Sequence, residues 1–133
     1  MKASDLHIVW TTPDNSRVTS RQYSFRLPVH VAAKIEALCV MYSTRTRTEI
    51  VGDLLAAALQ EVEHSFPSVK GKEWGEDPDT GETIYEDLGP TARFWKIANR
   101  HYIEIEKELG TEKPNPLYSD EITVVKESEL KGT

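Results

Sequence analysis

The sequence predicts a mainly α-helical protein, in which one β-strand and two helices form a small domain and a third long helix follows in an extension. Three observations predict this fold class. Polar and apolar residues alternate over residues 21–28, two apolar stripes at helical spacing follow before residue 65, and a third stripe follows Gly89-Pro90. A period of two residues is typical of a half-buried strand, and a period of three to four is typical of a helix.

The predicted strand ends at Pro28, because proline cannot donate to a ladder of hydrogen bonds. Its polar side chains would share one solvated face, where an amide, a hydroxyl and a guanidinium can hydrogen-bond to base edges in a DNA major groove. The alternative is an ordinary solvent-facing strand. The apolar and the polar side chains that alternate are Tyr23, Phe25 and Leu27 and, between them, Gln22, Ser24 and Arg26.

Two helices are expected behind the strand. The polar turn between them ends in Thr46-x-x-Glu49, which is a capping-box signature for the start of the second helix. The apolar stripe of the first helix recurs at spacings of four, three and four residues, and consists of Val31, Ile35, Leu38 and Tyr42. The stripe of the second helix consists of Ile50, Val51, Leu54, Leu55, Ala58, Leu59 and Val62.

Strand, helix, capped turn and helix over residues 20–65 resemble the ribbon-helix-helix family, which includes the Arc, MetJ and CopG-type repressors. The resemblance rests on Gln22-x-Ser24-x-Arg26-x-Pro28 and on Thr46-Arg47-Thr48-Glu49, where the family commonly has Ser-Arg-Ser-Glu. The glycine that usually closes the first helix is absent, and Ser43 or Thr44 stands there. The resemblance implies a dimer that pairs its strands antiparallel and inserts this ribbon into the major groove of double-stranded DNA.

A homodimer is also expected on physical grounds. Fewer than fifty residues rarely bury enough surface to fold alone, and a lone strand leaves its backbone hydrogen bonds unmade. The dimer, which could assemble further on DNA, would present Gln22, Ser24 and Arg26 twice to the bases. The start of the second helix would bind phosphates, because unpaired helix amides attract anions. The phosphate-contacting residues are predicted to be Arg45, Thr46, Arg47 and Thr48.

The charge distribution permits DNA binding although the net charge is −6. Between Arg17 and Arg47 the sequence has six basic residues and one acid, whereas Glu73 to Asp87 has seven acids and no base. DNA binding depends on the surface that faces the phosphates and not on the total charge of the chain. The two halves of the chain are therefore expected to have different partners.

Three regions are predicted: an N-terminal segment over residues 1–15 with a short helix after Ser4, the DNA-binding and dimerisation domain over 16–65, and a C-terminal extension over 66–133. Within the extension, Pro78-Asp79-Thr80-Gly81 indicates a hairpin or tight loop in an acidic turn region. A helix is expected over about 91–109, with Thr91 as its N-cap and Gly110 just after its end. The tail beyond it is expected to be loosely held.

Catalysis, metal binding and membrane insertion are not expected. The sequence has no glycine-rich phosphate loop and no serine, histidine and aspartate arrangement, so we predict a non-enzyme without a cofactor. The segment from Asp77 to Leu88 departs from a calcium loop in its glycine and its last ligand position. No apolar run is long enough for a membrane span and no secretion signal is visible, so a cytoplasmic protein is expected.

The leading functional prediction is a sequence-specific transcription regulator that acts as a repressor. The alternative is the antitoxin of a toxin-antitoxin pair, in which the extension would bind the toxin. A second alternative is a protein-interaction adapter that uses its acidic extension and only dimerises through the N-terminal domain. Under each of these readings, residues 66–133 could contact a protein partner.

Overall fold

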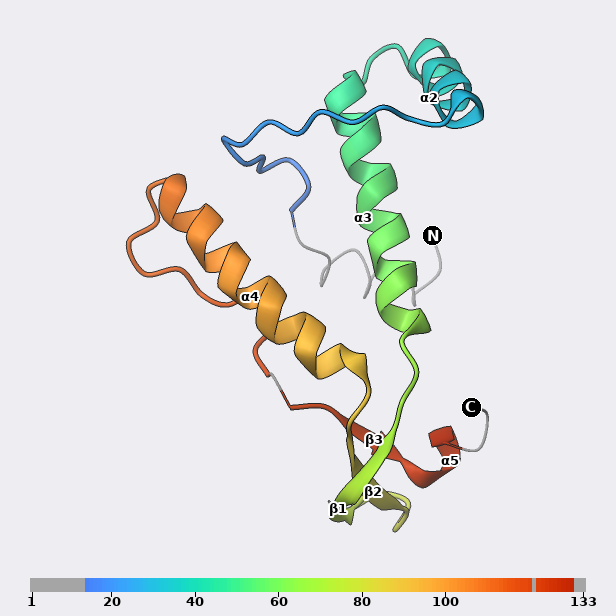
Figure 1. Cartoon of the computed structure of the whole chain (residues 1–133), viewed down its shortest axis with the longest axis vertical. Coiled ribbons are helices and arrows are strands. Elements are labelled where there is room, and N and C mark those ends of the chain that lie inside the picture. The colour runs from blue at the N-terminus through green and yellow to red at the C-terminus, as the bar shows by residue number, and fades with distance from the viewer. Residues whose placement is uncertain (1–13, 121, 131–133) are drawn as a thin grey trace. The chain divides into compact units, whose positions relative to one another are not determined.

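The computed structural model describes residues 14–120 and 122–130, and Figure 1 shows their arrangement along the chain. The predicted helix after Ser4 lies outside these residues. The described helices are α2 (Val29–Met41), α3 (Arg47–Ser65), α4 (Pro90–Glu108) and the short α5 (Glu127–Leu130). The described strands are β1 (Lys70–Glu76), β2 (Thr83–Asp87) and β3 (Val124–Lys126).

The predicted fold class is wrong. The described residues form an α/β fold in which β1, β2 and β3 make a three-stranded antiparallel sheet, and no ribbon-helix-helix strand is present among them. Residues 21–28 contain neither strand nor helix. The physical reason is that alternation alone does not make a strand, because the backbone also needs a hydrogen-bonded neighbour. No described segment of the chain pairs with the backbone of residues 22–27.

The chain divides into two compact units, Met1–Leu59 and Gln60–Thr133, with the division inside α3. In the first unit, both predicted helices are confirmed. α2 begins directly after Pro28, whose carbonyl accepts a 3.0 Å hydrogen bond from the amide of Ala32. α3 begins with the predicted capping box, because the amide of Glu49 donates to Thr46 Oγ1 at 3.1 Å and the amide of Thr46 donates to Glu49 Oε1 at 3.2 Å.

In the second unit, the acidic turn joins β1 to β2 at the place where the sequence predicts a hairpin or loop. The amide of Asp77 donates to the carbonyl of Glu82 at 2.8 Å, and the amide of Gly81 donates to the carbonyl of Asp77 at 2.7 Å. Gly81 has a φ of 72°, a conformation that glycine adopts without steric cost. The turn therefore brings two short polar segments into antiparallel register.

The segment predicted to be a loose tail is part of the sheet. Val124–Lys126 pairs antiparallel with β2, and Val125 is directly opposite Tyr85. Val125 is only 3% exposed, which makes it the most buried apolar residue in the described chain. A short apolar run surrounded by charged residues thus provides the third strand.

α4 follows β2 closely and begins at Pro90, slightly earlier than predicted. Its N-cap is Gly89, with Pro90 at the first helical position, so the prediction that Thr91 caps the helix is wrong. No side chain caps the helix; just before it, Oδ1 of the buried Asp87 carboxylate accepts hydrogen bonds from the amides of Gly89 at 2.8 Å and Val69 at 2.9 Å. At the other end, Gly110 has a φ of 96°, which confirms its predicted position just after the helix.

The segment after α4 folds back onto the helix. The buried side chain of Asn99 donates to the carbonyl of Tyr118 at 3.0 Å and accepts from its amide at 2.7 Å. The Tyr118 ring stacks on Trp95 with centroids 5.1 Å apart, and its hydroxyl donates to Glu63. Burial and the Glu63 carboxylate raise the pKa of Tyr118, so this phenol stays protonated. Phe94 completes the cluster by an edge contact with the Tyr118 ring.

Candidate nucleic-acid interface

The predicted base-contacting side chains lie on the segment before α2. Gln22, Ser24 and Arg26 are all exposed, and none of them has a hydrogen bond or ion pair within the described chain. On the residues between them, the rings of Tyr23 and Phe25 stack in nearly parallel planes with centroids 6.1 Å apart. Stacking of residues two apart means that these two rings share one side of the backbone, although no strand forms.

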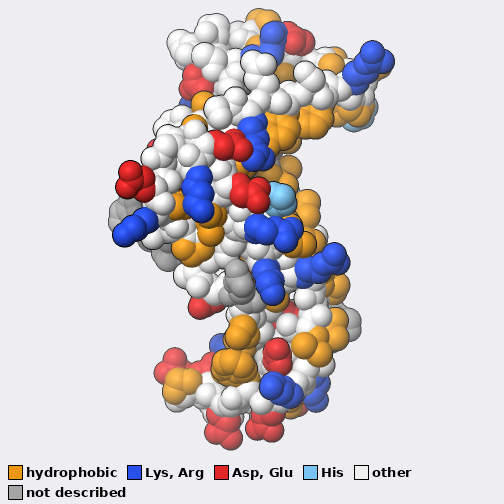
Figure 2. Space-filling model, turned by 60° about the vertical axis from the view of Figure 1, so that its left-hand side comes forward, with side chains coloured by type: hydrophobic (Ala, Val, Ile, Leu, Met, Phe, Trp, Pro, Cys, Tyr) orange, Lys and Arg blue, Asp and Glu red, His pale blue; other side chains and the backbone are white. Residues whose placement is uncertain are grey.

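The apolar side of this segment has little cover within the first unit. Phe25 is 72% exposed, and among the described residues of this unit only Ile50 is a buried apolar residue. Figure 2 shows apolar side chains exposed among charged ones over the molecular surface. Further exposed apolar residues of the first unit are Val18, Tyr23, Leu27, Val29, Val40, Met41, Tyr42, Leu54, Leu55 and Leu59. An isolated soluble chain rarely exposes this much apolar surface.

A shallow pocket of about 280 Å³ opens between α2 and α3 in the same unit. It is lined by Leu38, Tyr42, Arg45, Ile50, Asp53 and Leu54, of which Arg45 and Asp53 form an ion pair.

The predicted phosphate-contacting residues gather at the start of α3. Thr46 caps the helix, and Thr48 is exposed in its first turn. Arg47 Nη2 lies 2.7 Å from Glu36 Oε2 of α2, and this carboxylate raises the pKa of Arg47. Both side chains of the pair are more than half exposed, so solvent and anions can reach them.

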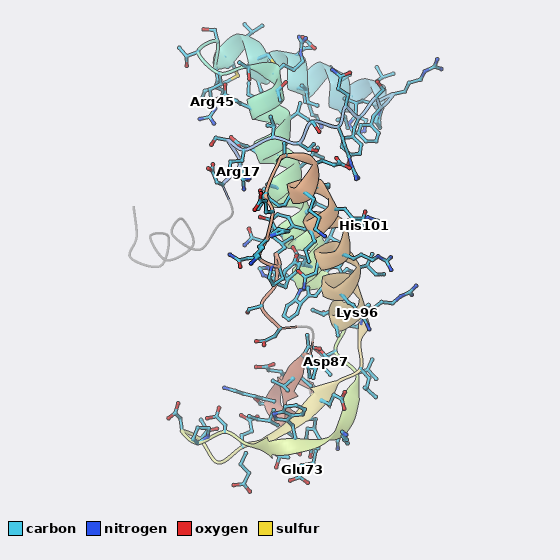
Figure 3. The ribbon with its side chains drawn as sticks, turned by 90° about the vertical axis from the view of Figure 1, so that its left-hand side faces the viewer. Arg17, Arg45, Glu73, Asp87, Lys96 and His101 are labelled. Atoms are coloured by element: carbon cyan, nitrogen blue, oxygen red, sulfur yellow. The ribbon has the colours of Figure 1, made fainter. Side chains whose placement is uncertain are left out.

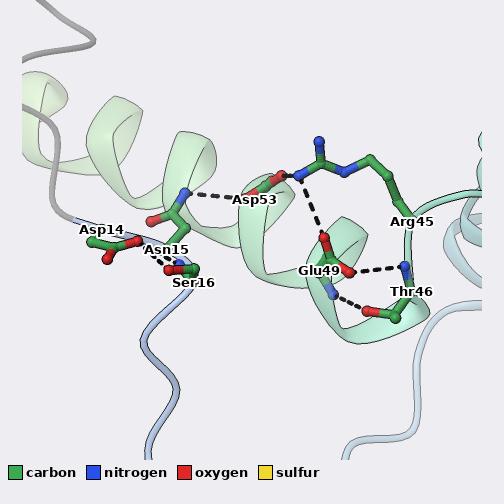
Figure 4. A network of polar contacts seen from close by, with 7 residues as sticks. All are labelled: Asp14, Asn15, Ser16, Arg45, Thr46, Glu49 and Asp53. Atoms are coloured by element: carbon green, nitrogen blue, oxygen red, sulfur yellow. Dashed lines mark hydrogen bonds and ion pairs between the residues drawn. The ribbon is translucent and has the colours of Figure 1, made fainter.

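Arg45 is the centre of a second network, which Figure 4 shows from close by. Its Nη2 atom lies 2.9 Å from Asp53 Oδ2 and 3.9 Å from Glu49 Oε2. The other oxygen of Asp53 accepts a 3.2 Å hydrogen bond from Asn15 Nδ2, which ties the segment before residue 21 to α3. Next to Asn15, the carboxylate of Asp14 accepts hydrogen bonds from the hydroxyl and amide of Ser16, and these bonds lower the pKa of Asp14.

Sequence reasoning missed the roles of Glu36 and Asp53. Glu36 is eleven residues before Arg47, and Asp53 is eight residues after Arg45, so neither pair has the spacing of neighbours on one helix. Only the weaker contact between Arg45 and Glu49 has such a spacing. The two close pairs depend on how α2, the turn and α3 fold together.

The second unit has a different electrostatic character. Glu73 and Asp87 lie at its sheet in Figure 3, whereas Arg17 and Arg45 belong to the first unit. Lys126 donates to the Asp77 carboxylate at 2.9 Å and holds the pKa of Asp77 below its usual value.

Within residues 14–120 and 122–130, no group of three metal-ligating side chains is found. No helix in the same ranges is long and apolar enough to cross a membrane.

Comparisons of the chain with protein-family models, with curated proteins and with solved structures found no match. The functional interpretation therefore depends on the residues and their geometry.

Proposed function

We propose that the protein is a sequence-specific DNA-binding regulator that acts as a homodimer and represses transcription. One observation carries the proposal. The segment over residues 21–27 has exposed amide, hydroxyl and guanidinium groups on alternate residues, and the residues between them are apolar and also exposed. Such a segment suits two partners at once, one that is polar and one that is apolar.

DNA is the polar partner in this proposal. Arg26 can donate two hydrogen bonds to guanine, and Gln22 can make two hydrogen bonds with adenine, whereas Ser24 can contact either base. None of these side chains has to break a contact with another described residue before it binds. The basic residues between Arg17 and Arg47 favour the approach of a polyanion, although two of them, Arg45 and Arg47, pair with carboxylates of the chain.

The start of α3 would hold the DNA backbone. The first amides of a helix attract anions, and the hydroxyls of Thr46 and Thr48 add hydrogen-bonding groups there. Arg45 and Arg47 stand on either side of Thr46 and supply positive charge. These contacts would position the protein on DNA without reading its sequence, as phosphates are the same at every base pair.

A second copy of the chain is the apolar partner. The exposed apolar residues of the first unit far outnumber its one buried apolar residue among those described, Ile50, so this unit lacks the core that would stabilise it alone. A second copy provides the same apolar surface in return and would cover the rings of Tyr23 and Phe25. A two-fold dimer presents Gln22, Ser24 and Arg26 twice, so a palindromic DNA site is expected.

The second unit is not part of the proposed DNA surface. Its β1 to β2 region has seven acids and no base between Glu73 and Asp87, and phosphates would be repelled there. We propose that residues 66–133 contact a protein partner. The antitoxin function is the competing proposal, and it predicts that a toxin protects this region.

The test is recovery of DNA from a pool of random duplexes by the full-length protein. Enrichment of one inverted repeat supports the proposal. The Arg26→Ala variant should recover DNA with a weaker base preference, whereas Arg100→Ala, which removes the same charge from an exposed position on α4, should recover the wild-type repeat. Recovery of no duplex at low salt, or of duplexes without any common sequence, would contradict a sequence-specific regulator.

A further inference from the structure

We infer that Glu36 and Asp53 occupy the phosphate-binding arginines as internal substitutes for DNA, so that two carboxylates per chain must be displaced when DNA binds. The inference rests on the proposed function and adds that two ion pairs within the chain lower its affinity for DNA. It predicts that the protein binds every duplex more weakly than its arginines would allow. It also assigns a functional role to two acids outside the predicted interface.

The geometry of the first pair supports this inference. Arg47 Nη2 lies 2.7 Å from Glu36 Oε2, which is the distance of a charge-assisted hydrogen bond. A DNA phosphate would present the same kind of acceptor oxygen to the same guanidinium. Because the pair joins α2 to the first residue of α3, Arg47 is held beside its own helix N-terminus, where the phosphate is expected to bind.

The second pair has an additional support that keeps it in place. Asp53 holds Arg45 with one carboxylate oxygen at 2.9 Å and accepts from Asn15 with the other at 3.2 Å. Figure 4 shows this chain of contacts from Asn15 through Asp53 to Arg45. Removal of Arg45 by a phosphate would therefore leave Asp53 with one hydrogen-bond partner and an uncompensated charge. Glu49 contributes less, because its oxygen is 3.9 Å from Arg45 and its other oxygen closes the capping box.

The expected change in DNA affinity follows from the exposure of these ion pairs. The loss of one exposed ion pair changes the equilibrium constant of the process that breaks it by about 1.4- to 5-fold. A dimer contains two copies of each pair, so the loss of Glu36 pairing should raise DNA affinity by about 2- to 30-fold. The gain should be largest at low salt, because added salt screens the exposed pair before DNA arrives.

The experiment measures the affinity of the full-length protein for one random-sequence duplex over a range of salt concentrations. Glu36→Gln and Asp53→Asn remove one charge each and keep the shape of the side chain, and the amide oxygen introduced by Asp53→Asn could still accept from Asn15. Glu61→Gln on α3 is the matched control, as Glu61 is exposed and has no ion pair among the described residues. The first two variants should bind about 2- to 30-fold tighter than the control at low salt.

Two further variants distinguish displacement of the Glu36 carboxylate from Arg47 from simple repulsion between that carboxylate and the DNA phosphates. Glu36→Asp keeps the charge but shortens the side chain by one methylene, so it should lose contact with Arg47 and gain affinity as Glu36→Gln does. In an Arg47→Ala background, Glu36→Gln should have no more effect than Glu61→Gln, because the interaction between the two sites is then absent. If Glu36→Asp binds like the wild type, or if the effect of Glu36→Gln persists without Arg47, the inference is overturned.

The outcome also distinguishes this inference from the function on which it rests. If the wild type binds DNA and both charge-neutral variants match Glu61→Gln, the displacement inference fails and DNA binding stands. If neither the wild type nor any variant binds DNA at low salt, the proposed function itself fails.

Discussion

Gly89→Ala is expected to destabilise the second unit because the position has no room for a methyl group. A Cβ atom at residue 89 would lie 2.1 Å from the carbonyl oxygen of Pro67 and 2.9 Å from Asp87 Oδ1. Carbon and oxygen atoms without a covalent bond approach to about 3.3 Å at closest, so the backbone must move by about 1 Å. The backbone at residue 89 has a φ of −70°, so the reason is the close approach and not an unusual conformation.

The loss of stability in Gly89→Ala has two causes. Overpacking of a close contact costs about 1–3 kcal/mol. The movement also disturbs the hydrogen bond from the amide of residue 89 to the buried Asp87 carboxylate, and a bond to a charged group contributes about 1.5–3 kcal/mol. Together they predict a loss of about 2.5–6 kcal/mol in the free energy of unfolding.

The assay is urea unfolding of the full-length protein, followed by the fluorescence of its tryptophans. With a denaturant dependence of about 2 kcal/mol per molar urea, the midpoint of the unfolding transition of the second unit should shift down by about 1.3–3 M. Gly75→Ala, in β1 of the same unit, is the matched control, since a Cβ atom there meets nothing within 4 Å. A Gly89→Ala transition as stable as that of Gly75→Ala would refute the close approach between the start of α4 and the carbonyl of Pro67.

Three other predictions concern the same folded chain. Lys126 lowers the pKa of Asp77 in the folded state, so the pair stabilises the fold above the unfolded pKa of about 4 and loses this contribution as the pH falls through the lower pKa of the folded state. Asp77→Asn should therefore reduce the fall of the urea midpoint at acidic pH. An unchanged fall of the midpoint would exclude the pair with Lys126. Asn99→Leu leaves the amide and carbonyl of Tyr118 unpaired and should destabilise by about 2–4 kcal/mol, with faster amide exchange over residues 111–120; retained protection there would contradict the anchoring role. Homodimerisation predicts a melting temperature that rises with protein concentration, and a midpoint that is constant over a hundredfold dilution would argue against it.

The helices and their starts can be predicted from the sequence because their causes are local. The apolar stripes of α2 and α3 and the capping box of Thr46 and Glu49 all involve residues within one or two turns of each other. The position of Gly110 is predictable for the same reason. The predicted cap at Thr91 is wrong, because the helix starts earlier, with Gly89 as its N-cap and Pro90 at its first position.

The strands are harder to predict than the helices, because each strand needs a hydrogen-bonded partner that the local sequence does not specify. Residues 22–27 have the alternation of a strand and no neighbour in the described chain. Val124–Lys126 has only three residues and becomes a strand because β2 offers its free edge. In the candidate interface, the positions of Arg45 and Arg47 are predictable from the cap, but their pairing with distant carboxylates is not.

The most direct test of sequence-specific DNA binding compares the affinities of wild type and Arg26→Ala for the recovered repeat and for a scrambled duplex of the same composition. An arginine that contacts guanine contributes about 1–3 kcal/mol of discrimination, so Arg26→Ala should lose at least that preference and retain its affinity for the scrambled duplex. Arg100→Ala should retain both affinities. If Arg26→Ala prefers the recovered repeat as strongly as the wild type does, the segment over residues 21–27 does not read DNA.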